Sequence, residues 1–170
     1  MGFLKIICFY LFTFLLLSPA YSQNMDNEKP EKILYVVSDT IAGENGGWEF
    51  SVNGLPMLCI TDQVNNRMRI IAPVREMKDV SDDQLKEAMA ANFHSALDVK
   101  YAISNDLVWA AFIHPLKELS KDQVISAVSQ VYNAYSTFGT TYSSTDLVFP
   151  DPQNREKEQE KKEKLRRSKI

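Results

Sequence analysis

Residues 47–62 read GWEFSVNGLPMLCITD, and this stretch decides the fold. Trp48, Phe50 and Val52 alternate with polar residues, which is the period of a strand with one buried face. Asn53-Gly54 is the strongest short hairpin signal, because both residue types accept the positive φ of a tight turn. A second strand then continues to Asp62. The stretch therefore predicts an antiparallel hairpin with one apolar face.

The neighbouring residues extend this hairpin into a sheet preceded by a helix. Asn65-Asn66 predicts a second turn, since Asn tolerates left-handed dihedrals, and residues 68–74 predict a third strand. Upstream, apolar residues at helical spacing predict a short helix over residues 30–42, with Gly43 as its C-cap. These apolar residues are Ile33, Leu34, Val37 and Ile41.

Helical and strand patterns alternate again in the second half of the chain. Two capping boxes, at residues 81–84 and 120–123, each predict the start of a helix. Between these helices, residues 99–104 and 107–113 predict two strands around an Asn105-Asp106 turn. The expected apolar stripe of the earlier helix consists of Leu85, Ala88, Met89, Phe93, Ala96 and Leu97. The resulting order, αβββαββα, is that of an α+β domain.

The first 22 residues predict a secretory signal that is cut before Gln23. Lys5 supplies the positive charge, residues 6–17 are apolar apart from Thr13, and Ala20-Tyr21-Ser22 offers small residues for cleavage. A membrane anchor is the alternative, but the apolar run is shorter than the ~20 residues that a span needs. We therefore expect an exported protein, periplasmic or secreted, in a bacterial envelope.

Charge divides the rest of the chain into an acidic body and a basic tail. Residues 23–150 hold 17 Asp and Glu against 10 Lys and Arg, whereas residues 151–170 hold 8 basic against 5 acidic residues. We expect a spacer at 23–30, one domain at 31–150, and a charged, disordered tail at 151–170. An acidic body argues against a nucleic-acid partner. We expect the tail to be solvated rather than to lie on an anionic membrane, because Glu156, Glu158, Glu160 and Glu163 interrupt its basic residues.

Four short motifs occur in order along the domain: Trp48 to Gly54, Asn66 to Ile70 followed by Ala72-Pro73-Val74, Asn92, and Val108-Trp109 leading to His114-Pro115-Leu116. As a series they resemble the YbjN domain over residues 47–142. This is a family of bacterial sensory transduction regulators related in fold to type III secretion chaperones. The resemblance implies a twisted antiparallel sheet with helices packed mainly on one face, here with five strands. It also implies a protein-binding rather than a catalytic role.

The predicted turns separate the two faces of the sheet, because residues opposite each other in an antiparallel pair point to the same side. The face expected to carry the helices includes Trp48, Phe50, Val52, Met57, Cys59, Thr61, Ile70 and Ala72, and the paired residues Ile103 with Val108, Tyr101 with Ala110 and Val99 with Phe112. The opposite face is expected to carry Leu58, Ile60, Ile71, Leu107, Trp109, Ala111 and Ile113, bordered by Glu49, Lys100 and a cross-strand pair of Asp62 with Arg69. The second face is too apolar for an ordinary solvated surface.

This apolar second face has two interpretations. In the first, it binds a partner through Leu58, Ile60, Ile71, Leu107, Trp109 and Ile113. In the second, the N-terminal spacer, the last helix or the tail covers it.

The sequence carries no recognisable catalytic or metal-binding constellation. His94 and His114 are too far apart for a metal pair, and Cys59 is expected to be a buried thiol. No nucleophile elbow, zinc-protease motif or phosphate loop occurs. We therefore expect no metal, no cofactor and no enzymatic activity. Asn92 is expected to hold a loop carbonyl.

The leading hypothesis is a non-enzymatic exported module, chaperone-like or regulatory, that binds a protein or peptide client through the apolar sheet face. The alternative is a small-ligand-binding protein or a hydrolase that uses His94 or His114. A second copy of the chain, in a two-fold homodimer, is the other expected partner, since the edges and the apolar face of a small sheet are self-complementary.

Overall fold

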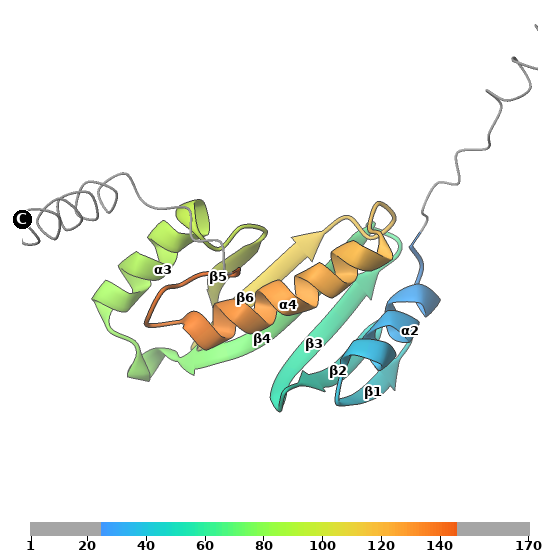
Figure 1. The fold of residues 1–170 in the computed structure, drawn as a ribbon, viewed down its shortest axis with the longest axis horizontal. Coiled ribbons are helices and arrows are strands. Elements are labelled where there is room, and N and C mark those ends of the chain that lie inside the picture. The colour runs from blue at the N-terminus through green and yellow to red at the C-terminus, as the bar shows by residue number, and fades with distance from the viewer. Residues whose placement is uncertain (1–24, 146–170) are drawn as a thin grey trace, which may run out of the picture.

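The predicted hairpin is formed by β2 (Gly47–Val52) and β3 (Leu55–Asp62), within a six-stranded antiparallel sheet of order β1-β2-β3-β4-β6-β5 (Figure 1). The computed structural model describes residues 25–145, so the predicted signal at 1–22 and tail at 151–170 lie outside the described residues. The remaining elements are α2 (Glu28–Val37), β1 (Thr40–Glu44), β4 (Arg67–Glu76), the 3-10 turn η1 (Met77–Asp79), α3 (Asp82–His94), β5 (Val99–Ser104), β6 (Leu107–His114) and α4 (Lys121–Thr137).

The prediction of five strands was wrong, because β1 occupies residues that were expected to complete the first helix. α2 ends at Val37, and Ser38 stops it by donating its hydroxyl to the Leu34 carbonyl at 2.7 Å. The chain then turns back as a strand, with Ile41 opposite Phe50 of β2. Ile41 packs against the core from a strand, which the helical spacing of the apolar residues had concealed.

The turn between β1 and β2 accounts for the glycines at positions 43 and 46. Asn45 and Gly46 both have positive φ, 55° and 94°, and Glu44 lies opposite Gly47, so this is a second Asn-Gly hairpin. Gly43 is a strand residue and not a helix cap. A Cβ at Gly43 would lie 2.2 Å from the Gly47 carbonyl oxygen, so the close approach of the two strands requires a glycine there.

The predicted pairing of Asp62 with Arg69 was also wrong. Residues 63–66 form a four-residue turn, which places Asp62 opposite Arg67 and Ile60 opposite Arg69. Asn65 stabilises this longer turn by donating its backbone N–H and its side-chain amide to the Asp62 carboxylate at 2.9 and 2.7 Å. The shift is two residues, so every side chain keeps its face.

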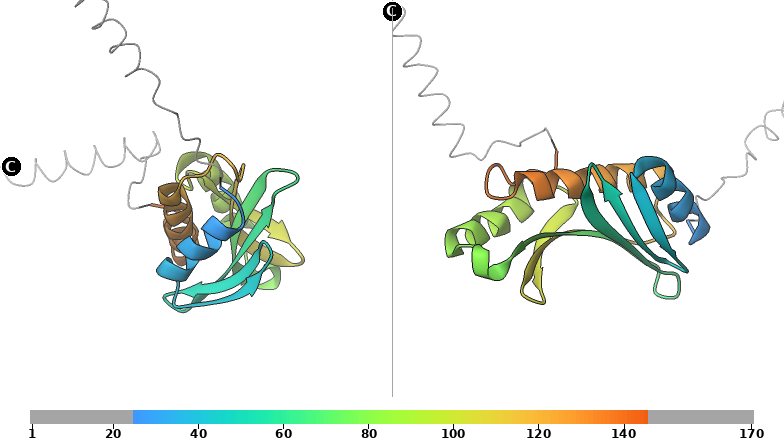
Figure 2. Two further views of the ribbon diagram at one scale, coloured as in Figure 1. Left: turned by 90° about the vertical axis from the view of Figure 1, so that its right-hand side faces the viewer. Right: turned by 90° about the horizontal axis from the view of Figure 1, so that it is seen from below.

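The core lies between the sheet and two helices, α2 and α4, which pack on the same face (Figure 2). α4 crosses β4 and β6 and buries a stripe at helical spacing, namely Val124, Ala127, Val128, Val131 and Ala134. The strands contribute Trp48, Phe50, Met57, Cys59, Met68 and Ile70 to the same core. No helix within residues 25–145 is long and apolar enough to cross a membrane.

α3 lies beside β5 at one end of the sheet, and its apolar stripe does not pack as expected (Figure 1). Its capping box forms as predicted at Ser81 and Gln84. Of the helix residues, only Ala88 and Ala91 are buried, whereas Met89 and Phe93 are 68% and 88% exposed. The helix therefore packs through Ala88, Ala91 and the partly buried Leu85, and the side chains of Met89 and Phe93 lie in solvent.

Candidate functional site

We call the sheet face opposite α2 and α4 the open face; it carries Leu58, Ile60, Ile71, Leu107, Trp109 and Ile113. Among the described residues, no helix packs on it, and Figure 2 shows β4 arching beneath α4. The strand register places these side chains in adjoining rows. One row crosses the whole sheet and reads Ala42, Glu49, Leu58, Ile71, Ala111 and Lys100. The next reads Ile60, Arg69 and Ile113.

The six predicted residues remain accessible to different degrees. Ile60 and Ile113 are 45% and 55% exposed, so the edge of the face nearest the β3–β4 turn is open to solvent. Leu58, Ile71, Leu107 and Trp109 are half-buried. The structure thus brings the six residues onto one continuous face, and their role in binding stays a prediction.

Trp109 is held in place on this face. Its indole Nε1 donates to the Ser104 carbonyl at 3.0 Å, which satisfies the ring nitrogen within the β5–β6 hairpin. Trp109 lies opposite Pro73 of β4, where the pairing of β4 with β6 is irregular between Pro73 and Arg75. A fixed aromatic ring loses little side-chain entropy when a partner packs on it. Trp109 therefore has the character of an anchor residue.

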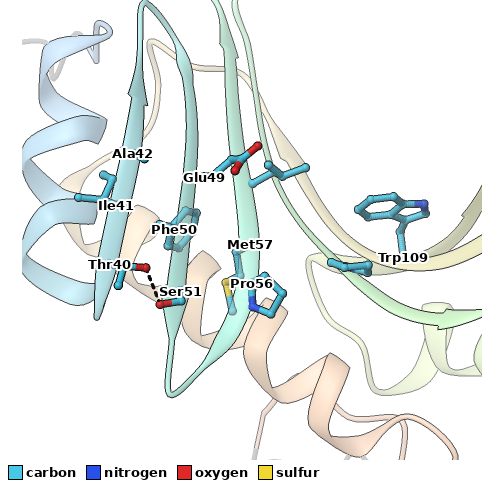
Figure 3. A pocket seen from close by; sticks show the side chains of 11 residues that line it. Thr40, Ile41, Ala42, Glu49, Phe50, Ser51, Pro56, Met57 and Trp109 are labelled. Atoms are coloured by element: carbon cyan, nitrogen blue, oxygen red, sulfur yellow. Dashed lines mark hydrogen bonds between the residues drawn. The ribbon is translucent and has the colours of Figure 1, made fainter.

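A groove of about 420 Å³ runs from Trp109 across the open face toward β1 (Figure 3). Its apolar lining from the open face includes Leu58, Pro56, Pro73 and Ala42. Glu49 lies in its wall, and the hydroxyls of Thr40 and Ser51 are hydrogen-bonded to each other at 2.8 Å. The groove has the mixture of apolar surface and few polar groups that suits peptide side chains.

The charges around the open face are arranged unevenly. Arg69 lies between Ile60 and Ile113, so a cation interrupts the exposed apolar edge. Lys100 is turned toward the end of α3, where its Nζ donates to the backbone carbonyls of Asn92, at 2.8 Å, and Leu97. The face can therefore offer Arg69 to a carboxylate and Glu49 to a cation of a partner.

The residues considered for catalysis lie in structural settings. Cys59 is fully buried in β3, and burial raises the pKa of its thiol to about 12, so it remains protonated at neutral pH. The His114 ring stacks on Phe112, with its Nδ1 2.8 Å from the Pro115 carbonyl oxygen, and His94 is exposed beside Phe93. Within residues 25–145, no group of three or more His, Cys, Asp or Glu side chains is placed to hold a metal ion.

Asn92 has a clear structural role, although it holds a strand and not a loop. Its side-chain amide donates to the Tyr101 carbonyl at 3.1 Å, and its Oδ1 accepts from the Tyr101 N–H at 2.7 Å. Both groups belong to β5, an edge strand of the sheet. Asn92 therefore supplies the hydrogen bonds that a further strand would otherwise make there.

Part of the groove was missed by the sequence analysis. Thr40 and Ala42 belong to β1, which was expected to be helical, and Pro56 and Pro73 were not assigned to a face. The Asn45-Gly46 dipeptide was the available signal for β1, since it marks a hairpin whose first strand must precede it.

No family model matches the chain, and no curated protein is significantly similar to it in sequence. Solved structures do share its fold. A chain of the HopA1–SchA chaperone–effector complex is 12% identical with a TM-score of 0.52, over 66% of this chain and 94% of that chain. A chain of the crystal structure of the Yersinia pestis type III secretion chaperone SycH, in complex with a stable fragment of YscM2, has the same identity, TM-score and coverage of this chain, with 98% of its own length covered. The chain therefore has a fold like that of type III secretion chaperones, as the resemblance implied.

Proposed function

We propose that this protein is a non-enzymatic, chaperone-like or regulatory module that binds a protein or peptide client through the open face. The observation that carries the proposal is the apolar open face, on which Ile60 and Ile113 are exposed and Leu58 and Ile71 half-buried, and which continues into the groove beside Trp109. Contiguous apolar surface of this kind on a small domain marks an interaction site.

The fold supports a protein client. The two similar structures are complexes of a chaperone with an effector or with a stable protein fragment. We propose that this chain also belongs with the YbjN-like proteins, on the series of motifs from Trp48 to Leu116. Both relationships favour binding over catalysis.

We further propose that the client is met outside the cytoplasm. Lys5, the apolar run at 6–17 and Ala20-Tyr21-Ser22 support a signal cut before Gln23. The composition of the remaining chain supports a domain over 31–150 and a charged tail at 151–170. Mass spectrometry of the protein recovered from an envelope fraction would identify its first residue. A chain that retains residues 1–22 and stays in the cytoplasm would contradict the export proposal.

Site-specific crosslinking tests the open face directly. A photoreactive side chain at Ile60 or Ile113 should capture a client in the native envelope, whereas the same group at Val64 should capture none. Val64 is the matched control, because it is 95% exposed on the neighbouring β3–β4 turn but lies off the open face. Equal capture from all three positions would refute a specific client site.

Substitutions separate binding from folding. Trp109→Ala and Ile60→Asp should both abolish client capture. Ile60→Asp should change the free energy of unfolding by no more than about 1 kcal/mol, because Ile60 is exposed. Trp109→Ala should cost about 2 kcal/mol, because the half-buried indole donates to the Ser104 carbonyl, and this is still less than the loss of a core aromatic residue. If both variants instead unfold as core variants do, the face is covered within the monomer and the proposal fails.

A hydrolase or small-ligand enzyme is the rival proposal, and it would depend on His94 or His114. Their settings, one in solvent beside Phe93 and one stacked on Phe112, give them structural explanations. Alanine variants at both positions that abolish a measured turnover would favour the enzyme and count against the binding module.

We also propose that two copies associate through α3. Met89 and Phe93 are one helical turn apart and exposed, and Leu97, just beyond the end of the helix, is 37% exposed. Two antiparallel α3 helices would place the acidic first turn, with Asp82 and Asp83, beside the last turn of the second copy, which carries His94. Such a dimer leaves the open face free, because α3 lies at one end of the sheet (Figure 1).

Light scattering over a dilution series tests this assembly. Phe93→Glu should give a monomer at concentrations where the unmodified chain is dimeric, and Val64→Glu, at a still more exposed position, should leave the dimer intact. A chain that is monomeric throughout the series would rule the α3 dimer out without affecting the client proposal.

A further inference from the structure

A second and larger groove, of about 540 Å³, lies on the other side of the molecule from the open face, between α2 and the start of α4. Its floor is apolar and consists of Met25, Ile33, Val36 and Leu119. Three of these side chains are buried, whereas Val36 is 74% exposed and forms the open edge. The Met25 N–H donates to the Lys117 carbonyl at 3.3 Å, which ties the segment before α2 to the loop before α4. The groove is therefore formed by two elements whose relative position is fixed by this hydrogen bond.

The rim of this groove is cationic. Lys29 and Lys32 reach it from α2, Lys121 reaches it from the first turn of α4, and among residues 25–145 no carboxylate contributes to its lining. Lys29 and Lys32 each have an acidic neighbour on their own segment, Asp26 at 3.7 Å and Glu28 at 3.4 Å, and both pairs are solvent-exposed. Exposed pairs of this kind are weak and exchange readily for a better-placed anion. In a body with seven more acidic than basic residues, this concentration of lysines favours an anionic occupant.

The hydrogen-bonding groups of the lining favour an acyl chain over a peptide as the occupant of the groove. Apart from the lysines, the only polar side chain that the described part of the chain brings to the lining is Ser120. Its oxygen already accepts from the Gln123 N–H at 3.1 Å, and its own N–H donates to the Gln123 side chain at 2.7 Å. An extended peptide would bring backbone N–H groups that these side chains do not satisfy. An acyl chain brings none.

We propose that this groove binds a single-chain anionic amphiphile of the fatty-acid type, with its chain on the floor and its carboxylate among Lys29, Lys32 and Lys121. The length of α2 from Lys29 to Val36 is about 10 Å, which matches a medium-length chain. The volume is in the range of small-ligand pockets. This site is separate from the client face and does not depend on it.

Decanoate, used below its micelle concentration, is the probe. Nuclear magnetic resonance titration of the labelled full chain should show saturable shifts in the amides of α2 and the first turn of α4. The Trp109 indole signal, which reports the open face, should not move. Lengthening the chain should strengthen binding by roughly two- to fourfold per methylene. Shifts centred on Trp109, or no saturable shift in α2, would overturn the proposal.

Matched variants and a matched probe test the two halves of the site. Val36→Asp should abolish binding, whereas Tyr35→Asp, equally exposed but outside the groove, should preserve it. Lys121→Gln should weaken binding by about two- to fivefold, and Lys117→Gln should not. Decyltrimethylammonium, with the same chain and a cationic head, should fail to bind. Equal binding of the cation, or displacement of decanoate by a second copy or an acidic helical peptide with higher affinity, would overturn the assignment.

Discussion

Asn92→Ala tests whether the α3 amide holds the edge strand β5. The substitution removes two hydrogen bonds, at 3.1 and 2.7 Å, and leaves the N–H and C=O of Tyr101 without these partners in a partly buried position. At about 0.5–1.5 kcal/mol for each bond, the loss is about 1–3 kcal/mol. Alanine is a better helix former than asparagine by roughly 0.6 kcal/mol, which offsets part of that cost. We expect a net destabilisation of about 1–2 kcal/mol.

Urea denaturation measures this change, and amide hydrogen exchange locates it. Exchange at the Tyr101 amide should accelerate more than exchange in β3, because the effect begins at the sheet edge. Lys86→Ala on the exposed side of α3 is the control, and its free energy of unfolding should change by less than about 0.5 kcal/mol. A change this small for Asn92→Ala, or an unaltered Tyr101 exchange rate, would refute the role assigned to Asn92.

Three further predictions concern stability. Gly43→Ala should cost about 3 kcal/mol in unfolding free energy, because φ is +120° and the new Cβ meets the Gly47 carbonyl. Gly54→Ala should cost only about 1 kcal/mol, because φ is +77° but no atom lies within 4 Å of the new Cβ. Similar losses at the two sites would contradict this. Stability should fall by roughly 1.4 kcal/mol per pH unit as the pH rises from 9 toward 12. In this range the Cys59 thiol ionises in the unfolded chain, where its pKa is near the ordinary 9.0, but stays protonated in the folded chain, where burial raises its pKa to about 12. Cys59→Ala should therefore lessen the slope of stability against pH in alkaline melts. Ser81→Ala should destabilise the protein by about 1 kcal/mol through loss of the α3 cap, and an unchanged thermal midpoint would argue against the capping box.

The faces of the sheet were predictable even where the register was not. Asp62 lies opposite Arg67 and not Arg69, yet Ile60 and Ile71 keep their expected side. The reason is that a turn lengthened by two residues preserves the alternation of side chains. Local pattern therefore located Trp109 and its neighbours on one surface without the correct pairing.

The groove on that face could not be predicted in full, because part of its lining, Thr40, Ile41 and Ala42, comes from β1. Ile41 satisfies a helical stripe with Ile33 and Leu34 as well as it satisfies a strand opposite Phe50. Apolar spacing over so few residues does not distinguish a helix from a strand. The segment forms a strand because it pairs with the edge of β2, whose backbone groups would otherwise lack hydrogen-bond partners.

The chain's local patterns determined the Asn53-Gly54 and Asn105-Asp106 turns, both capping boxes, the strand faces and the apolar character of the second face, since each depends on residues near one another in sequence. Tertiary structure decided that β1 pairs with β2 and does not extend the first helix, and it alone decided the exposure of Met89 and Phe93 and the two grooves. A helical stripe of apolar residues indicates which side chains can be buried, but whether they are buried depends on where the helix packs. α3 docks at the end of the sheet through Ala88 and Ala91, so Met89 and Phe93 on its other side stay exposed to solvent.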